Sequence, residues 1–418
     1  MNRFGVSVAL VAVSGVALMR CNQLAGIGAP VLVDEDAASA EAGEPDVAAG
    51  PNDAAIDATA PDASLGSDSA PPPQPEAGND APSAADAADA PSSTGPAIVS
   101  IVSARAHPAG WIGAVGGDAV QINGTGFVSG ADLAFSCNGS PLTSVAYVSS
   151  TTVNAIAPAQ TNVTSPTQSF SCAGTNGDGT PIAPVAGAIT YNWDPTQLGD
   201  TFWWVRADRG ITQDGGAVSS WAPLVDNSGA GPATQPTASN QPTYVANALN
   251  GVMPALYNDH VIGTDLVTSS FPTPLTTTFS VSVVAQETGT VSPGVEYIFV
   301  SDIKGTPTFE LYQTTLPDGL YVESSNGQVL SPSTAAVSSP FAASVVYATA
   351  GSISLNGNVV ATGNTAATAF TGLTLLAYYN GFDQAQGYLS EVIVENGALG
   401  GANATALHAY FHSFWGTP

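Results

Sequence analysis

The sequence predicts an all-β fold for the globular part of the chain. Only 9% of the 418 residues are charged and 44 are glycine, whereas helices of soluble proteins are normally built from Glu, Lys, Arg, Leu and Ala. Polar and apolar residues alternate in short segments such as Thr278–Val284 and Thr308–Tyr312, which is the period of a half-buried strand. An Asn-Gly pair at 356–357, inside the alternating segment Ser352–Val360, predicts a tight hairpin turn.

The N-terminus has the pattern of a signal peptide, predicted over residues 1–21. One positive residue precedes the apolar run Phe4–Met19, which is too short to span a bilayer comfortably. Cys21 follows this run and resembles the acylated cysteine of exported bacterial lipoproteins, although Arg20 stands where that pattern has a small residue. The alternative is cleavage after Ala17 or Ala29 and secretion. We therefore expect an exported protein, anchored at the outer membrane or cell surface through a lipid on Cys21, or otherwise secreted.

Residues 22–95 predict a disordered stalk. They are rich in Ala, Asp, Pro and Ser, and 14 of the 33 acidic residues lie between Asp34 and Asp89, so this stretch cannot bury a core and should stay extended by self-repulsion. The formal net charge of the whole chain is −27. A charge of this sign and size repels phosphate backbones, so nucleic acid is not expected as a partner.

Residues 96–193 predict a small β-sandwich. Ala119–Ile122 alternates and is followed by Gly and Asn turn residues. The segments Gly116–Phe127, Thr152–Ala159 and Ile189–Tyr191 resemble the IPT/TIG immunoglobulin-like family. This resemblance implies an extracellular spacer or adhesive module without chemistry of its own.

Cys137 and Cys172 each lie in a Phe-Ser-Cys triplet. The triplets suggest two neighbouring strands with equivalent alternation, and export makes a disulfide between the two cysteines possible. The alternative is a pair of buried thiols. A disulfide would leave Cys21 as the odd cysteine, which favours its lipidation.

Residues 194–418 predict a second, larger sandwich that begins with a strand at Thr201–Asp208. Ala402–Phe414 is the one convincing helix outside the signal peptide, since its apolar side chains recur on one face. The region resembles the concanavalin A-like lectin/glucanase superfamily in its laminin-G-like branch, which implies a jelly-roll of two antiparallel sheets. The segments that carry this resemblance are Trp204–Asp208, Val218–Trp221, Asp226–Gly231, Gln241–Thr243, Leu249–Gly251 and Leu389–Glu395.

Glu391 and Glu395 are the candidates for catalytic carboxylates, because enzymes of this superfamily cleave glycans with two such groups on one strand. Position 393 is Ile where the family has an acid. Carboxylates four residues apart on a strand are separated by about 13 Å, too far for a retaining glycosidase. No enzymatic activity is therefore expected, and we expect Glu391 to form a structural ion pair with Arg206 between the last and first strands.

Other candidate sites are weaker. His408 and His412 have the spacing of two metal ligands on a helix, but no third His lies nearby in the sequence, so flanking surface histidines are the simpler interpretation. The loop Tyr378–Gln384 could bind a sugar through Tyr379, Asn380, Phe382 and Asp383. Simple core packing of its aromatic residues is the alternative. No cofactor is expected, although loop oxygens could hold Ca²⁺.

These observations favour a cell-envelope display protein with a non-catalytic, lectin-like module for adhesion or glycan binding. Its partner would be a glycan or a cell-surface or matrix protein, and its only membrane contact would be the N-terminal lipid. An envelope assembly component that binds a protein partner is the alternative. A polysaccharide-degrading enzyme is the less favoured one.

Overall fold

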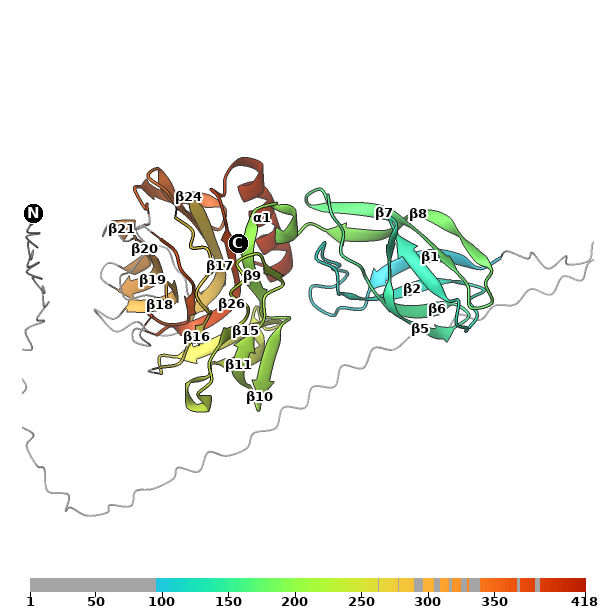
Figure 1. Ribbon diagram of the computed structural model, residues 1–418, viewed down its shortest axis with the longest axis horizontal. Helices are drawn as coiled ribbons and strands as arrows, with labels where there is room; N and C mark the ends of the chain where they lie inside the picture. The colour runs from blue at the N-terminus through green and yellow to red at the C-terminus, as the bar shows by residue number, and fades with distance from the viewer. Residues whose placement is uncertain are drawn as a thin grey trace, which may run out of the picture. The chain divides into compact units, whose positions relative to one another are not determined.

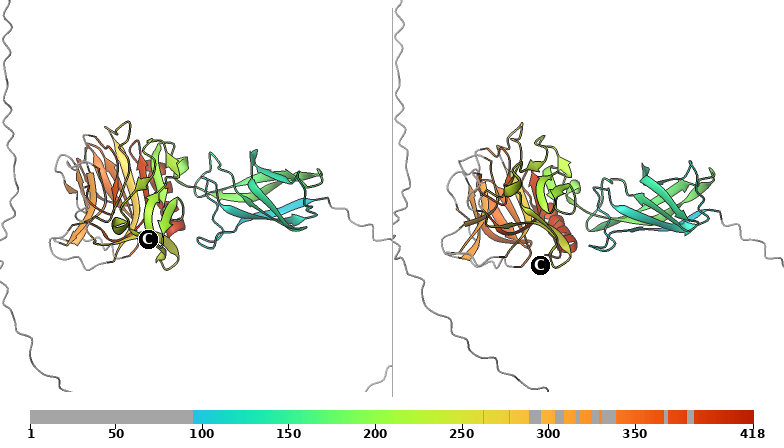
Figure 2. Two further views of the ribbon diagram at one scale, coloured as in Figure 1. Left: turned by 60° about the horizontal axis from the view of Figure 1, so that its bottom comes forward. Right: turned by 90° about the horizontal axis from the view of Figure 1, so that it is seen from below.

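The structure is a computed structural model that describes residues 95–418, with gaps at 262, 277, 289–295, 304–308, 316–317, 325–328, 331–338, 367–368 and 380–383 (Figures 1 and 2). The described residues all belong to one compact unit. The predictions for the signal peptide, for Cys21 and for residues 22–94 lie outside the described residues. In the part that is described, no helix is long and apolar enough to cross a membrane.

The all-β prediction is confirmed. Antiparallel strand pairs account for both groups of sheets, and the described residues contain a single α-helix, α1 (Gly401–Trp415), at the C-terminus. The helix was predicted at Ala402–Phe414, so its bounds are correct to one residue. The predicted hairpin is also present, with Asn356 and Gly357 at positive φ in its turn.

Residues 97–192 form two four-stranded antiparallel sheets, β1-β2-β6-β5 and β4-β3-β7-β8. Their bounds are β1 (Ala97–Ser103), β2 (Ala119–Thr125), β3 (Ala134–Cys137), β4 (Ser140–Pro141), β5 (Thr143–Ser149), β6 (Thr152–Ile156), β7 (Thr167–Thr175) and β8 (Pro181–Asn192). Alternate residues such as Val120 and Ile122 on β2 are buried. The two sheets therefore enclose a core, as their sequence alternation predicted.

The predicted disulfide between Cys137 and Cys172 is confirmed. The two cysteines lie directly opposite each other on β3 and β7, and both are buried. The repeated Phe-Ser-Cys triplet thus marked two paired strands, and the disulfide joins them within one sheet.

Residues 201–395 contribute the larger set of paired strands. Their bounds are β9 (Thr201–Arg206), β10 (Ile211–Asp214), β11 (Ala217–Trp221), β12 (Val225–Asp226), β13 (Ala233–Thr234), β14 (Thr243–Leu249), β15 (Met253–Asp259), β16 (Leu266–Val267), β17 (Phe279–Glu287), β18 (Glu296–Ser301), β19 (Phe309–Thr315), β20 (Asp318–Ser324), β21 (Val329–Leu330), β22 (Phe341–Tyr347), β23 (Gly351–Leu355), β24 (Asn358–Gly363), β25 (Thr374–Leu375) and β26 (Gln386–Glu395). The 3₁₀ turns η1 (Pro195–Gln197) and η2 (Ala238–Asn240) complete the elements.

Strand β26 is the centre of this region. One of its edges pairs with β17, while the other pairs with β15 over its first half and with β9 over its second half. The first strand, β9, therefore closes against the last, as the sequence predicted. Figure 1 shows α1 in red beside β9 and β26. Because α1 covers one face of these strands, all six residues of β9 are buried.

Candidate functional site

All three arginines of residues 95–418 converge on two buried aspartates. Arg105 donates to Asp118 at 2.9 Å and to Asp208 at 2.6 Å, and Arg209 also pairs with Asp118. Arg206 donates to Asp208 at 2.6 Å. We call these five residues the arginine cluster. It joins the loops next to β1 and β2 with the end of β9, so ionic contacts connect the two groups of sheets.

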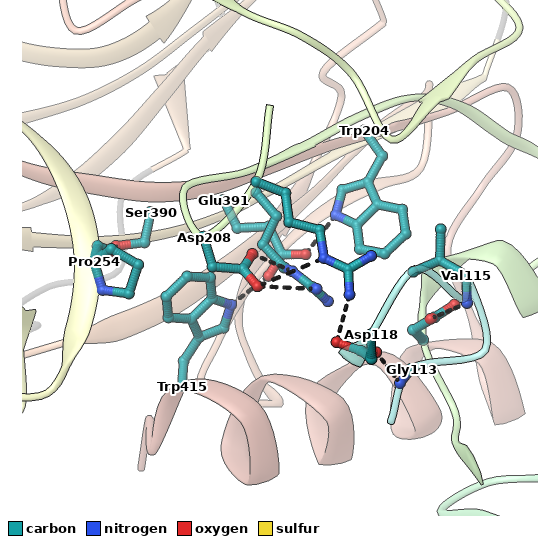
Figure 3. Close-up of polar contacts among 12 residues, drawn as sticks. Gly113, Val115, Asp118, Trp204, Asp208, Pro254, Ser390, Glu391 and Trp415 are labelled. Carbon is teal, nitrogen blue, oxygen red and sulfur yellow. Dashed lines mark hydrogen bonds and ion pairs between the residues drawn. The ribbon is translucent and has the colours of Figure 1, made fainter. Parts of the chain in front are cut away.

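The backbone at Gly116 and Gly117 leaves room for Arg209 and accepts a hydrogen bond from it. Arg209 donates to the carbonyl of Gly116 at 2.5 Å. Gly117 has φ +76°, and a Cβ there would lie 2.9 Å from the Arg209 guanidinium. The Gly-Gly turn therefore gives Arg209 the room to approach Asp118. Asp118 also accepts from the backbone N–H of Gly113 at 2.8 Å (Figure 3).

Asp208 is the centre of the charge balance. Burial raises the pKa of its carboxyl, but the charges of Arg206 and Arg105 outweigh burial and hold the pKa below its usual value. Arg206 itself is completely buried. Its guanidinium carbon lies 4.3 Å from the ring centre of Phe414 on α1, a distance that gives a cation–π contact.

The predicted ion pair of Arg206 with Glu391 is replaced by the pair of Arg206 with Asp208. The two residues do lie opposite each other on β9 and β26, but Glu391 receives neutral donors instead. Trp204 donates at 2.5 Å, and Trp415 donates to the second carboxylate oxygen (Figure 3). Tyr410 also donates, at 2.8 Å. Arg206 reaches Glu391 only through the Tyr410 hydroxyl, to which it donates at 3.3 Å. Asp208 follows Arg206 by two residues in the chain, and its carboxylate is the one that the Arg206 guanidinium contacts directly.

Glu391 and Glu395, the candidates for catalytic carboxylates, lie in different surroundings. Both oxygens of Glu391 accept hydrogen bonds, and the residue is inaccessible to solvent. Burial raises its pKa to about 7. Glu395 lies at the far end of β26, opposite Thr201 and Ser280, and burial together with the charge of Asp200 raises its pKa to about 8. The two carboxyls therefore contact different groups.

The two histidines on α1 also contact different groups. The Nδ1 atom of His412 lies 2.5 Å from the carbonyl oxygen of Thr417. His408 faces the β23–β24 turn, where a Cβ on Gly357 would touch its ring. Across the residues that the structure describes, no group of three or more His, Cys, Asp and Glu side chains is placed to hold a metal ion.

Most of the predicted ligand loop lies outside the described residues. Asn380, Phe382 and Asp383 belong to the gap at 380–383. Tyr379 is described, and its ring centre lies 4.4 Å from that of Tyr378 in a T-shaped contact. Tyr378 in turn packs against buried Tyr321. The loop leads directly into β26, where a second group of aromatic and polar side chains lies.

This second group is the tyrosine patch, formed by Tyr257, Asp259, Gln386 and Tyr388. Tyr257 on β15 pairs with Tyr388 on β26, and Asp259 pairs with Gln386. Residues directly opposite in an antiparallel pair project from the same face. The two rings lie 5.0 Å apart at an angle of 41°. Tyr257, Tyr388 and Gln386 are half-buried and Asp259 is exposed, so this face is open to solvent.

Hydrogen bonds connect the polar atoms of the tyrosine patch. The Tyr257 hydroxyl donates to Asp259 at 3.0 Å, and the Gln386 amide donates to the same oxygen at 3.4 Å. Burial and the hydrogen bond to Asp259 raise the pKa of Tyr257. The patch therefore presents aromatic faces beside a carboxylate and an amide, all on the strands of a sheet rather than on a loop.

Sequence reasoning missed the tyrosine patch because Tyr257 and Tyr388 are each single aromatic residues in separate strands. The signal that could have found it is weak: each tyrosine is followed or preceded within two residues by a polar side chain, Asp259 or Gln386. Only the pairing of β15 with β26 brings the four together.

No protein-family model matches the sequence, and no curated protein matches it. Among solved structures, a sialidase of Trypanosoma rangeli is 10% identical with a TM-score of 0.37, covering 54% of this chain and 34% of its own. Domain 4 of AbnA, a GH43 extracellular arabinanase from Geobacillus stearothermophilus in complex with arabinotriose, is 12% identical with a TM-score of 0.35, covering 50% of this chain and 99% of its own. The binding domain of botulinum neurotoxin DC, in complex with SialylT, is 13% identical with a TM-score of 0.29, covering 37% and 42%.

The chain thus spans about a third of the length of the sialidase that it matches. Similarity at these TM-scores assigns neither a family nor a function to the chain, whose all-β architecture rests on its own strand pairing.

Proposed function

We propose that the chain is an exported, non-catalytic binding protein whose tyrosine patch takes a carbohydrate chain without ionised groups. In this proposal the Cys21 lipid anchors the protein to the cell envelope and the acidic stalk extends it from the surface. An IPT/TIG-like module and a laminin-G-like module then form the displayed part. The observation that carries the proposal is the tyrosine patch, where two adjacent rings lie next to a carboxylate and an amide.

These side-chain types suit a sugar. Tyrosine offers an apolar face and a polar tip at low cost in conformational entropy, and the apolar face can cover the C–H face of a pyranose. The carboxylate of Asp259 accepts from hydroxyls, and the amide of Gln386 both donates and accepts. The position of these groups on the strands β15 and β26 fixes them before binding, which reduces the ordering cost.

The charge distribution favours an uncharged ligand. Asp259 is exposed within the patch, and every arginine of residues 95–418 belongs to the arginine cluster. An anionic group about 6 Å from Asp259 would be repelled by roughly 0.5–1 kcal/mol in water, with no guanidinium there to compensate. Sugars that carry carboxylate or sulfate groups should therefore bind more weakly than neutral ones.

A glycan array probed with the full-length chain, followed by calorimetric titration of the best ligand, tests the proposal. We expect binding to neutral glycans, and about tenfold weaker binding for Tyr388→Ala, since aromatic anchors in an interface contribute 1 kcal/mol or more. Tyr147→Ala is the matched control, because Tyr147 is 40% exposed on β5 and lies outside the tyrosine patch.

Three results would contradict the proposal. Binding of acidic glycans in preference to neutral ones would contradict the ligand class. No glycan binding, together with stoichiometric capture of one envelope protein, would favour the assembly-component alternative. Sugar release by the chain would favour an enzyme.

A further inference from the structure

Glu395 is a buried carboxylate without a hydrogen-bond donor. It ends β26, lies opposite Ser280 on β17 and Thr201 on β9, and is 1% exposed. Its Oε1 atom is fully buried and has no hydrogen-bond partner. A buried carboxylate normally requires donors or a positive charge, because burying an uncompensated charge costs several kcal/mol.

The hydroxyl protons next to Glu395 are used elsewhere. Ser280 donates its hydroxyl proton to the carbonyl of Gly397 at 2.8 Å and accepts from the N–H of Leu399 at 2.7 Å. Thr201 donates to the carbonyl of Pro195 at 2.6 Å. Neither hydroxyl therefore has a proton left to donate to Glu395. Only oxygen lone pairs remain, and these cannot stabilise a carboxylate.

A second carboxylate adjoins this position. The N–H of Asn396, the residue after Glu395, donates to the carbonyl of Asp200 at 2.9 Å. A Cβ on Gly397 would lie 2.8 Å from Asp200 Oδ2, so the Asp200 side chain approaches the end of β26. The Oδ1 atom of Asp200 is also buried without a partner. Two carboxyl groups with unsatisfied oxygens thus lie near each other, and two negative charges there would repel each other.

The described arginines cannot supply the missing positive charge, because the arginine cluster uses all three. The neighbouring residues instead offer oxygen atoms: the carboxylate of Asp200 and the lone pairs of the Thr201 and Ser280 hydroxyls. Carboxylate and hydroxyl oxygens are the ligands that hard divalent cations prefer, and a bound cation would favour the ionised form of both carboxyls. Asp200 is half-exposed, which gives an ion a path from solvent.

We propose that Asp200 and Glu395 bind a divalent cation, with Ca²⁺ as the best fit, at the junction of β9, β17 and β26. Ca²⁺ takes six to eight oxygens in flexible geometry and accepts carbonyls and water beside carboxylates. Mg²⁺ demands a stricter octahedron. The cation would link the start of β9, just after η1, to the end of β26.

Thermal unfolding of the full-length chain after EDTA treatment, with and without added CaCl₂, tests the proposal. A cation that binds only the folded state at a hundredfold excess over its Kd should raise the Tm by about 3 to 8 °C. Ca²⁺ bound by the acidic residues between Asp34 and Asp89 is told apart from this site by Glu395→Gln, which leaves those residues unchanged. Glu395→Gln should abolish the shift, whereas Asp214→Asn, an exposed acid on β10, should retain it.

A second readout keeps the test decisive if Glu395→Gln does not fold. Tb³⁺ luminescence excited through tryptophan should report a site close to Trp203 and Trp204 on β9, and Asp200→Asn should remove that emission. Equal Tm values in EDTA and CaCl₂, or equal Tb³⁺ emission from the wild type and Asp200→Asn, would overturn the proposal. Glu395 would then be buried as the neutral, protonated acid, without a bound cation.

Discussion

The replacement Asp208→Asn tests how much the arginine cluster contributes to the stability of the protein. Asparagine has nearly the size of aspartate but no charge. It leaves the completely buried Arg206 without its ion-pair partner, since the next carboxylate, Glu391, is reached only through Tyr410. Arg105 keeps Asp118 at 2.9 Å.

The magnitude follows from burial. The side chain of Arg206 is 0% exposed and that of Asp208 is 8% exposed. Removing one partner of a buried ion pair typically costs about 3–5 kcal/mol, because the other charge remains uncompensated. Arg105 is 17% exposed and retains Asp118 as a partner. The loss of the Arg105–Asp208 pair should therefore cost less than about 1 kcal/mol of stability. We therefore expect Asp208→Asn to lower the free energy of unfolding by about 3–4 kcal/mol.

Urea denaturation followed by tryptophan fluorescence measures this loss, because Trp203, Trp204, Trp221 and Trp415 are all buried. Urea is uncharged and leaves ion pairs unscreened. The control Asp214→Asn, on the exposed edge of β10, should change stability by less than about 0.5 kcal/mol. A loss below about 1 kcal/mol for Asp208→Asn would refute the assignment of Asp208 as the partner on which Arg206 depends.

Three further predictions concern pH, the disulfide and ligand choice. The pKa of Glu391 is raised from 4.5 to about 7 in the folded protein. Protonation of Glu391 therefore stabilises the fold fully below pH 4.5, and this contribution is lost as the pH rises to 7. Glu391→Gln should therefore flatten the decline of stability between pH 4.5 and 7 by about 2–4 kcal/mol, and an unchanged pH profile would contradict the raised pKa. Reduction of the Cys137–Cys172 disulfide, which encloses a separation of 35 residues, should cost about 4 kcal/mol in the chain-entropy model; a midpoint of urea unfolding that does not shift with dithiothreitol would disprove this. Asp259→Asn should narrow the preference for neutral over acidic glycans two- to fivefold, measured as the ratio of their Kd values, and an unaltered ratio would show that Asp259 does not set it.

Local sequence patterns predicted the elements of the fold well. The helix at residues 401–415, the Asn356-Gly357 hairpin and the disulfide all follow from patterns within a few residues: periodicity, turn preference and a repeated triplet. The helix and the hairpin depend on local interactions. The disulfide follows from the same residue alternation on two strands. The closure of β9 against β26 was also foreseen.

Long-range partners could not be predicted in the same way. Arg105 and Asp208 are separated by 103 residues, and Trp204 and Glu391 by 187. No periodicity within either segment specifies such a contact, because strand register and loop geometry decide which carboxylate is nearer. This is why the sequence paired Arg206 with Glu391, its neighbour across the strands, and overlooked Asp208, its neighbour along the chain.

The most direct test of the proposed function is calorimetric titration of a neutral oligosaccharide into the wild type and into the double variant Tyr257→Ala/Tyr388→Ala. The circular dichroism spectrum of the variant checks that its sheets are intact. If the two rings form the binding platform, the affinity should fall by at least about a hundredfold. An unchanged Kd in a folded double variant would contradict the assignment of the tyrosine patch as the binding site.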